Sequence, residues 1–437
     1  MHCSNCDTEL PNDAKFCPEC GAEFSIPLKK PVAQNSIPPR RAPPAEATLP
    51  SIPPRRAPPS QVPENPAPSS AMFIPRKTRR ARRASASRII ISLILIFAVI
   101  GSAMAVITLT TWGSYKGDAR YTYAPSTFPA KDSWSFSTDS ANMNIQYTTN
   151  ISAPEIQVAV HYDFAGAFLK GKTAADVYTL TFDNASKHFS LARTNVLTFA
   201  MLDNSSVLVT LNPTVIFSIT ASIASGNLAM TIPDGIKVGD LSMTTVSGNN
   251  HLVVGNNDTI NGTVSMAATS GNVNFTSGSS NFTKSMAFQD TSGNVGVTMT
   301  GGNAGGNIMA NTTSGNVNMN IANVTLASNI RLDVGDVSGN VILTMDQRLN
   351  PTKNVLCYLG DVSGNVDVNY KARSTQSSAL LSSTKVSGTI NCINNGGFES
   401  LAGGSVFQTM NQGNPSRFDA NVAVVSGNIH IIGQMFA

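Results

Sequence analysis

The second half of the chain alternates apolar and polar residues in short segments, each introduced by the same tripeptide. Val317-Asn-Met319-Asn-Ile321 places apolar side chains on one face and asparagines on the other. A period of two predicts β-strands with one buried face. The tripeptide is Ser-Gly-Asn, or once Ser-Gly-Thr, and its glycine is expected at a corner that needs positive φ. These glycines are Gly226, Gly248, Gly271, Gly293, Gly315, Gly339, Gly364, Gly388 and Gly427.

The tripeptide recurs every 22 to 25 residues from Ser225 to Ser387, and again 39 residues later at Ser426. Such a period is typical of repeat architectures. One unit cannot bury its apolar face alone, but units stacked about 4.8 Å apart build a continuous core, and asparagines in one register are expected to form ladders. We predict a mostly β protein with a β-solenoid, or β-helix, over 212–437. A β-sandwich of hairpins is the competing fold, although it does not explain the constant spacing.

Residues from about 205 to 437 resemble an adhesin-type family of repetitive β-solenoid domains of unknown function, whose hallmark is an S-G-N/D turn followed by V-x-V strands. The resemblance implies a fold more than an activity. The 39-residue gap departs from the pattern, so an inserted loop or a degenerate coil is expected there. Residues 114–211 have strand patterns without the tripeptide and form either a membrane-proximal β subdomain or a cap for the stack.

A run of 23 uncharged residues, Ile89 to Thr111, predicts one transmembrane helix, because a helix of that length reaches about 34 Å. Seven cations precede it within residues 76–88, whereas few charges follow it. The positive-inside rule then places the N-terminus in the cytoplasm and the C-terminal domain outside a cell membrane. Ala103-Met104-Ala105 resembles a signal-peptidase site, but the 88 preceding residues favour an uncleaved anchor.

The N-terminal residues 1–26 contain two CxxC pairs separated by ten residues. Two such knuckles complete a tetrahedral shell of four thiolates, which is typical of a structural zinc site with no open position. A segment this short needs metal binding to fold, while a redox pair or an iron site is the alternative. The predicted ligands of one Zn²⁺ ion are Cys3, Cys6, Cys17 and Cys20. Residues 3–24 resemble the zinc-ribbon domain at the N-termini of many membrane proteins.

Residues 27–75 are rich in proline and repeat the nonapeptide SIPPRRAPP at 36–44 and 51–59. Proline fixes φ and removes a donor, so we predict a disordered linker that spaces the ribbon from the bilayer. Docking of the repeats on a proline-binding partner is the alternative. The basic juxtamembrane segment 76–88 is expected to contact anionic lipid headgroups through its cations from Arg76 to Arg88.

Sequons and two distant cysteines characterise the region after the span. All Asn-x-Ser/Thr sequons of the chain lie after the apolar run, which makes them candidate glycosylation sites if the region after the run is exported. They begin at Asn150, Asn184, Asn204, Asn257, Asn261, Asn274, Asn281, Asn311 and Asn323. Cys357 and Cys392 are about one and a half coils apart, so free thiols are favoured over a disulfide, which stays an alternative.

The sequence contains no constellation typical of catalysis. Its five histidines are scattered, and the GxSxG, GxxxxGK[ST] and HExxH motifs are missing. We therefore predict a non-enzymatic surface protein whose solenoid is a structural or adhesion module with an unidentified envelope or cell-surface partner. The alternative is a transmembrane signalling or scaffolding protein whose ribbon recruits a cytoplasmic protein. Nucleic acid is not expected, because few cations lie near the ribbon.

Overall fold

The computed structural model describes residues 93–102, 105–106, 110–194, 201–347, 353–373, 377–401, 404–410 and 416–436. The predicted zinc ribbon, linker and basic segment lie outside the described residues. Within the predicted span, residues 93–102, 105–106 and 110–111 are helical. None of the helices in the described part of the chain has both the length and the apolar character that a bilayer crossing requires.

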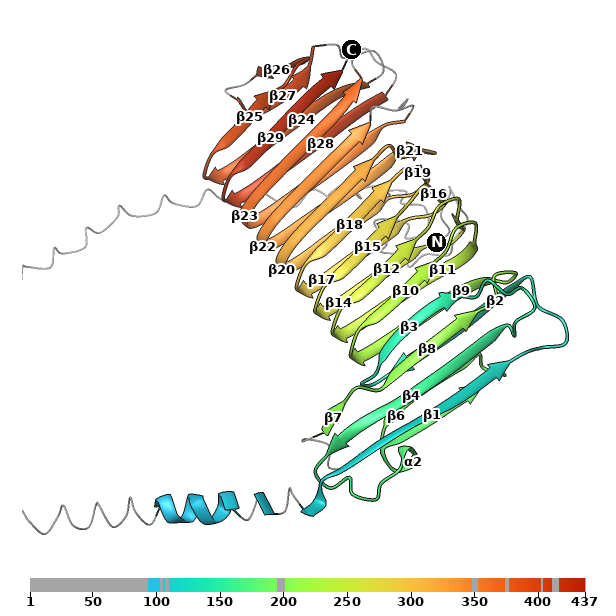
Figure 1. Ribbon diagram of the computed structural model, residues 1–437. Coiled ribbons are helices and arrows are strands. Elements are labelled where there is room, and N and C mark those ends of the chain that lie inside the picture. Colours follow the sequence, from blue (N-terminus) through green and yellow to red (C-terminus); the bar gives the residue numbers. More distant parts are fainter. Residues whose placement is uncertain are drawn as a thin grey trace, which may run out of the picture. The chain divides into compact units, whose positions relative to one another are not determined.

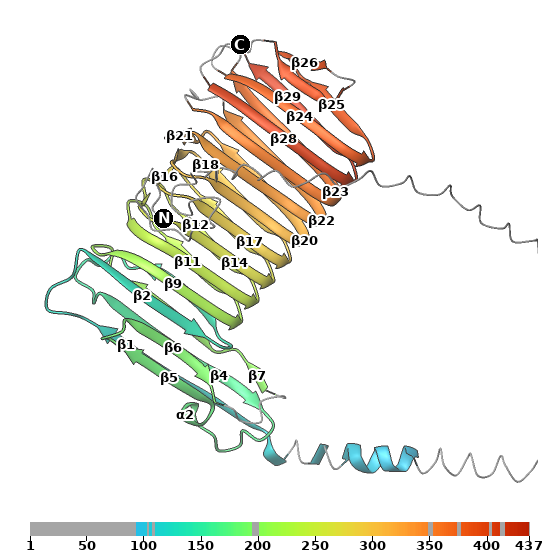
Figure 2. The same ribbon diagram turned by 180° about the vertical axis from the view of Figure 1, so that it is seen from behind.

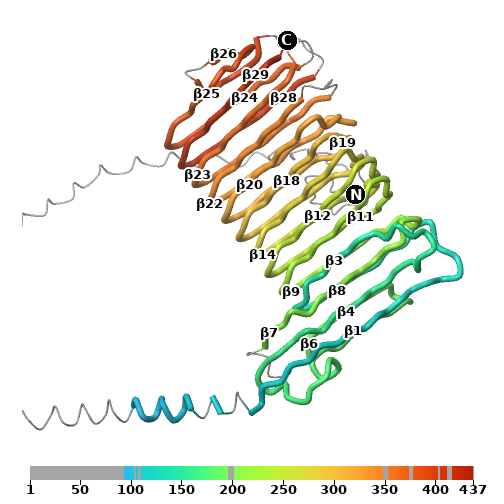
Figure 3. The backbone as a smooth tube through the Cα atoms, viewed as in Figure 1, coloured from blue at the N-terminus to red at the C-terminus, as the bar shows by residue number. Residues whose placement is uncertain are grey.

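Successive coils of the chain stack on one another through parallel strands (Figure 1; Figure 3). Each coil has one strand before the tripeptide and one after it, so two long sheets meet at the tripeptide. We call them the pre-corner and post-corner sheets. The separate pre-corner strands are β9 (Ile216–Ser225), β11 (Lys237–Ser247), β14 (Val264–Ser270), β17 (Met286–Ser292), β24 (Ser377–Ser387) and β28 (Ser416–Ser426). The separate post-corner strands are β10 (Leu228–Ile232), β12 (Asn250–Val254), β15 (Val273–Ser277), β18 (Val295–Thr300), β25 (Ile390–Asn394) and β29 (Ile429–Phe436).

Three longer strands pass through the tripeptide and belong to both sheets: β20 (Ile308–Ala322), β22 (Ile330–Gln347) and β23 (Val355–Arg373). In these coils the tripeptide lies inside a strand and not in a separate turn. Four short strands lie between a post-corner strand and the next pre-corner strand, and they pair with one another in parallel from coil to coil. They are β13 (Thr259–Ile260), β16 (Ser280–Phe282), β19 (Gly302–Ala304) and β21 (Thr325–Leu326).

Residues 113–211 extend the same two sheets. β2 (Lys131–Thr138) and β6 (His188–Arg193) continue the pre-corner sheet beside β9, as Figure 2 shows, and β3 (Asn142–Tyr147) and β8 (Ser206–Leu211) continue the post-corner sheet beside β10. Antiparallel strands end both sheets here. These are β5 (Tyr178–Asp183) on β6, β4 (Ile156–Gly166) on β8, and β1 (Gly113–Tyr123) and β7 (Met201–Asp203) on β4. One short helix, α2 (Ala174–Val177), precedes β5.

The last two coils stack in the reverse of their sequence order. β28 and β29 pair with β23 on one side and with β24 and β25 on the other, so the final coil is inserted between its two predecessors. The 39-residue gap between the last two tripeptides contains an antiparallel hairpin of β26 (Phe398–Leu401) and β27 (Val406–Thr409). Strand β27 pairs with the outer edge of β24. Stacking in simple sequence order, which the repeat pattern suggests, is wrong at this point.

The interior is formed by the alternate apolar side chains of both sheets. Val317, Met319 and Ile321 of β20 are at most 2% exposed, as their period of two predicts, and one cluster of buried residues runs from Trp134 to Ile431. Cys357 is buried on the pre-corner side opposite Ala420, whereas Cys392 lies opposite Ile431 on the post-corner side. Both thiols are free.

Candidate functional site

An asparagine ladder runs along the corner between the two sheets. Asn316 donates its backbone N–H and its side-chain Nδ2 to Asn294 Oδ1, at 3.0 and 2.9 Å, and Asn340 repeats this on Asn316 at 3.1 and 3.0 Å. Each rung thus accepts a side-chain hydrogen bond from the next rung, and most rungs also accept its backbone N–H. In spatial order the rungs are Asn142, Asn227, Asn249, Asn272, Asn294, Asn316, Asn340, Asn365 and Asn428.

The single Ser-Gly-Thr tripeptide lies at the end of this ladder. Thr389 donates its N–H and Oγ1 to Asn428 Oδ1, at 3.1 and 2.7 Å. The tripeptide belongs to the outermost coil of the stack, which has no further rung to support. At this position the side chain needs only to donate a hydrogen bond to the preceding asparagine and does not need to accept one, and threonine meets that requirement.

The corner glycines are required mainly because successive coils approach closely. A Cβ on Gly315 would lie 1.8 Å from the carbonyl oxygen of Gly293, and one on Gly364 would lie 1.5 Å from that of Gly339. Seven of the nine predicted glycines also have positive φ. Gly339 and Gly364 do not, so the expected need for positive φ is wrong at these two positions. Space for the neighbouring carbonyl is the requirement that all corners share.

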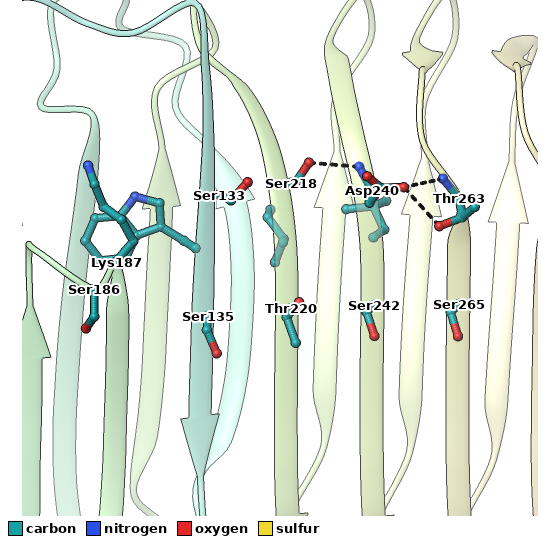
Figure 4. A pocket seen from close by; sticks show the side chains of 13 residues that line it. Ser133, Ser135, Ser186, Lys187, Ser218, Thr220, Asp240, Ser242, Thr263 and Ser265 are labelled. Carbon is teal, nitrogen blue, oxygen red and sulfur yellow. Dashed lines mark hydrogen bonds between the residues drawn. The ribbon is translucent and has the colours of Figure 1, made fainter. Parts of the chain in front are cut away.

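A groove crosses the pre-corner sheet at its N-terminal end, with a volume of about 440 Å³. Figure 4 shows hydroxyl side chains side by side on neighbouring strands, among them Ser135 on β2, Thr220 on β9, Ser242 on β11 and Ser265 on β14. Asp240 is held in place there, because its Oδ1 accepts hydrogen bonds from the N–H and Oγ1 of Thr263, at 2.8 and 3.0 Å. The groove therefore presents rows of hydroxyl groups with one carboxylate, Asp240, and one ammonium group, Lys187.

A cluster of charged and aromatic side chains borders this groove. Asp132 Oδ2 accepts hydrogen bonds from Lys187 Nζ and Trp134 Nε1, both at 2.9 Å. The Lys187 ammonium also lies 3.8 Å from the centre of the Tyr123 ring, a cation–π contact. Burial acts to raise the pKa of Asp132, but hydrogen bonds from Glu155, Lys187 and Trp134 outweigh it and hold that pKa below its usual range.

Glu155 is the buried member of this cluster. Its residue surface is 0% exposed, and neither carboxylate oxygen has a partner if the carboxyl is ionised. Burial, and then the hydrogen bond and charge of Asp132, raise the pKa of Glu155 to about 8. A carboxyl group with this raised pKa keeps its proton at neutral pH, so that no second negative charge lies beside Asp132.

The predicted glycosylation sites lie mostly at the surface. Asn281 and Asn311 are half-buried, and the other seven sequon asparagines are exposed. The predicted zinc ligands Cys3, Cys6, Cys17 and Cys20 lie outside the described residues. Within the described part of the chain, no three His, Cys, Asp or Glu side chains gather as they would around a metal ion.

Sequence reasoning missed two features of the site. The ladder begins at Asn142, in a Ser-Ala-Asn that differs from the repeat at one residue and could have been found by a looser search. The Asp132, Glu155 and Lys187 cluster has no sequence signal, because its members are far apart along the chain and come together only in the folded domain.

The comparisons with known proteins assign the family of the stacked domain. Residues 132–391 match the sequence model of the Toastrack DUF4097 family, which covers more than half of the chain. The chain belongs to the Toastrack family. Residues 2–24 match the zinc-ribbon domain, so an N-terminal zinc ribbon is joined to a Toastrack domain. The Toastrack match begins in β2 and ends in β25, before the inserted final coil. A comparison with curated proteins finds no match.

Solved structures of candidate adhesins are similar to the Toastrack part of the chain. A candidate cell adhesion protein from Clostridium sporogenes has 10% identity and a TM-score of 0.21, and the match covers 73% of this chain and 100% of that one. A candidate adhesin from Bacteroides fragilis has 10% identity and a TM-score of 0.31, with 73% and 97% covered. At these scores the likeness carries no argument about function.

Replacing Gly315 by alanine is expected to destabilise the Toastrack domain by at least about 2 kcal/mol, because the added Cβ would overlap the carbonyl of Gly293. Gly360 is the matched control, since a Cβ there meets no atom within 4 Å. Gly360→Ala should change stability by less than about 0.5 kcal/mol. Urea unfolding of the full-length chain measures both variants, and equal effects would contradict the close-approach argument.

Glu155 should make the N-terminal end of the stack sensitive to alkali. Its pKa in the folded protein is about 8, above the ordinary value of 4.5, so the folded state retains a proton that the unfolded state has lost. That stabilisation is lost as pH rises through 8. The melting temperature of the wild type should fall between pH 7 and pH 9, whereas Glu155→Gln, which stays neutral, should show a smaller fall. An identical fall in both proteins would refute the assignment.

Proposed function

We propose that this protein is a membrane-anchored, non-enzymatic surface protein whose Toastrack domain serves as a structural or adhesion module. The observation that carries the proposal is the unbroken asparagine ladder from Asn142 to Asn428, which fastens every coil of the stack to the next. A domain held together at every coil keeps its shape without a partner. It can therefore present its outer side chains at a fixed spacing of about 4.8 Å per coil.

The outer surface supports a role in contact and not in turnover. The groove on the pre-corner sheet is lined mainly by serine and threonine hydroxyls. Its one carboxylate, Asp240, is bonded to Thr263, and its one ammonium group, Lys187, is paired with Asp132. A hydroxyl needs a neighbouring base to act as a nucleophile. Rows of hydroxyls and amides suit many weak hydrogen bonds to a polar envelope or cell-surface partner, whose combined strength grows with the number of contacts.

Membrane anchoring rests on the sequence around residues 89–111. Twenty-three uncharged residues follow seven cations, and this asymmetry favours a cytoplasmic N-terminus and a Toastrack domain outside the membrane. The cations from Arg76 to Arg88 would then contact anionic lipid headgroups. Exposed sequons such as Asn184 and Asn257 would become available for glycosylation on the same side.

The zinc ribbon completes the proposal as a structural cytoplasmic module. Its four cysteines provide a closed thiolate shell, in which Zn²⁺ supplies folding free energy and leaves no position for a reacting water. A proline-rich linker of residues 27–75 separates the ribbon from the membrane. Such a linker suits the tethering of a cytoplasmic partner better than rigid coupling across the membrane.

The topology can be tested with single reporter cysteines in intact cells. A cysteine placed at Asn257, which is exposed, should react with a membrane-impermeant maleimide, whereas one placed at Ser36 in the linker should react only after lysis. Each reporter is introduced into a chain whose six native cysteines are replaced by serine, so that only the reporter is read. Labelling of Ser36→Cys in intact cells, or recovery of the chain in the soluble fraction, would refute the proposed anchor.

Zinc binding can be tested on the full-length chain by metal analysis. One Zn²⁺ per chain is expected, and Cys17→Ser should reduce the bound zinc to well below half of that value, because three thiolates leave the shell open. Cys392→Ser is the control, since that thiol lies in the Toastrack domain and is free. Equal zinc content in the two variants would show that the ribbon cysteines do not hold the metal.

A further inference from the structure

A row of side chains follows the corner on its inner side. Each member lies three residues before a corner glycine, and neighbouring members other than Thr312 and Asp336 are paired in register between adjacent pre-corner strands. We call it the pre-glycine row. In spatial order it contains Ile223, Thr245, Ala268, Asp290, Thr312, Asp336, Asp361, Val424 and Lys385.

The hydrogen-bond donors in this row all bond to a corner glycine. Thr245 Oγ1 donates to the carbonyl oxygen of Gly248 at 3.2 Å, and Lys385 Nζ donates to that of Gly388. Thr312 Oγ1 reaches back to the preceding coil and donates to the carbonyl of Gly293 at 3.1 Å. The glycine carbonyls therefore offer acceptors to whatever side chain occupies the row.

Asp290, Asp336 and Asp361 present an acceptor where the threonines present a donor, and Asp336 and Asp361 occupy adjacent places in the row. Asp361 Oδ2 and the carbonyl oxygen of Gly339 both lie within 2.5 Å of the point that a Cβ of Gly364 would occupy. Oδ2 of Asp361 therefore lies on the side of the corner where the carbonyl of the preceding coil lies, as the Thr312 hydroxyl lies beside the carbonyl of Gly293. For Asp336 the neighbouring acceptor is the carbonyl of Gly315, and the two oxygens lie within 2.2 Å of the corresponding point.

The second carboxylate oxygens are buried without a donor. Oδ1 of Asp336 accepts the N–H of Ser338 at 3.1 Å and Oδ1 of Asp361 accepts that of Ser363 at 2.9 Å, but Oδ2 of each has no partner. The two residues are only 6% and 4% exposed. The N–H of Asn340 cannot serve, because it is bonded to the asparagine ladder. Two buried acceptors that face each other without a hydrogen are costly.

We propose that Asp336 and Asp361 bind protons in the folded protein, each donating a hydrogen bond from Oδ2 to the glycine carbonyl of the preceding coil. The proton comes from solvent, and the neutral carboxyl then takes the place that the Thr312 hydroxyl takes in its own coil. When the carboxyl ionises, the hydrogen bond is lost and two acceptors are left facing each other. The corner that joins β20 to β22 and β22 to β23 is therefore held together more tightly in acid than in alkali.

The charges around the pair agree with this assignment. Burial raises the pKa of Asp336, and burial together with the charge of Asp336 raises the pKa of Asp361 to about 6. Thr312 on β20 and Val424 on β28 are uncharged neighbours in the row, and Lys385 on β24 lies two coils away from Asp361. Because the folded pKa is above the ordinary value of 3.8, the stabilisation is present in acid and is lost as pH rises through 6.

Hydrogen exchange of the full-length chain at pH 5 and pH 8, corrected for intrinsic exchange rates, tests the proposal. In peptides from β22 and β23 that contain the tripeptide, the equilibrium constant for opening should be larger at pH 8 than at pH 5. Ionisation of Asp361 alone should increase it roughly tenfold. In the variant Asp336→Thr/Asp361→Thr both positions carry the donor that Thr312 provides, so this pH dependence should disappear. If the double variant does not fold, Asp361→Thr alone should remove the larger part of it.

A matched control removes a donor that does not titrate. Because Asp290 near Gly293 titrates as well, the comparison is made with the wild type at each pH: Thr312→Val should lower protection near Gly293 by the same factor relative to the wild type at both pH values. A pH effect of equal size in the wild type and in the double variant would overturn the proposal. So would protection of the wild-type corner by added Ca²⁺ at pH 8 that the double variant lacks, because a metal ion and not a proton would then join the carboxylates to the carbonyls.

Discussion

The structure depends on how closely one coil approaches the next at the corner between the two sheets. The carbonyl oxygen of each corner glycine occupies the space where a Cβ of the next glycine would lie, as for Gly293 and Gly315. Only glycine permits this approach, and the approach brings the following asparagines within hydrogen-bond distance. Glycine therefore sets the contact between coils, and asparagine, which donates and accepts at once, satisfies the backbone groups that the contact leaves over.

The same constraint explains how the stack ends. At the N-terminal end, Asn142 supplies the first acceptor of the ladder, and antiparallel strands such as β1 and β5 form the outer edges of the sheets. At the other end, Thr389 donates to the last asparagine, and β27 covers β24. Unprotected edges of parallel sheets invite association with other chains. These terminal features let the Toastrack domain stay a defined stack of coils.

Much of this arrangement could be predicted from the sequence, because a period of two and a repeated tripeptide report directly on side-chain direction and coil length. The buried alternation in β20 and the ladder through Asn316 are confirmed in the structure. The inserted final coil could not be predicted, since Asn428 bonds to Asn365 across 63 residues and the period gives no sign of it. The pre-glycine row and the Glu155 cluster were also not predicted, because both arise from burial and from contacts between coils.

A pair of engineered disulfides tests the stacking most directly. Val362 and Val425 are outward-facing neighbours on adjacent strands, whereas Val386 is one coil further away although it is closer to Val362 in sequence. In-register stacking with an inserted coil predicts that Val362→Cys/Val425→Cys forms a disulfide on mild oxidation, identified by mass spectrometry of the linked peptides. It also predicts that Val362→Cys/Val386→Cys does not, since about 9.6 Å separates strands two places apart and a disulfide needs Cα atoms within about 7 Å. The opposite result would contradict the account.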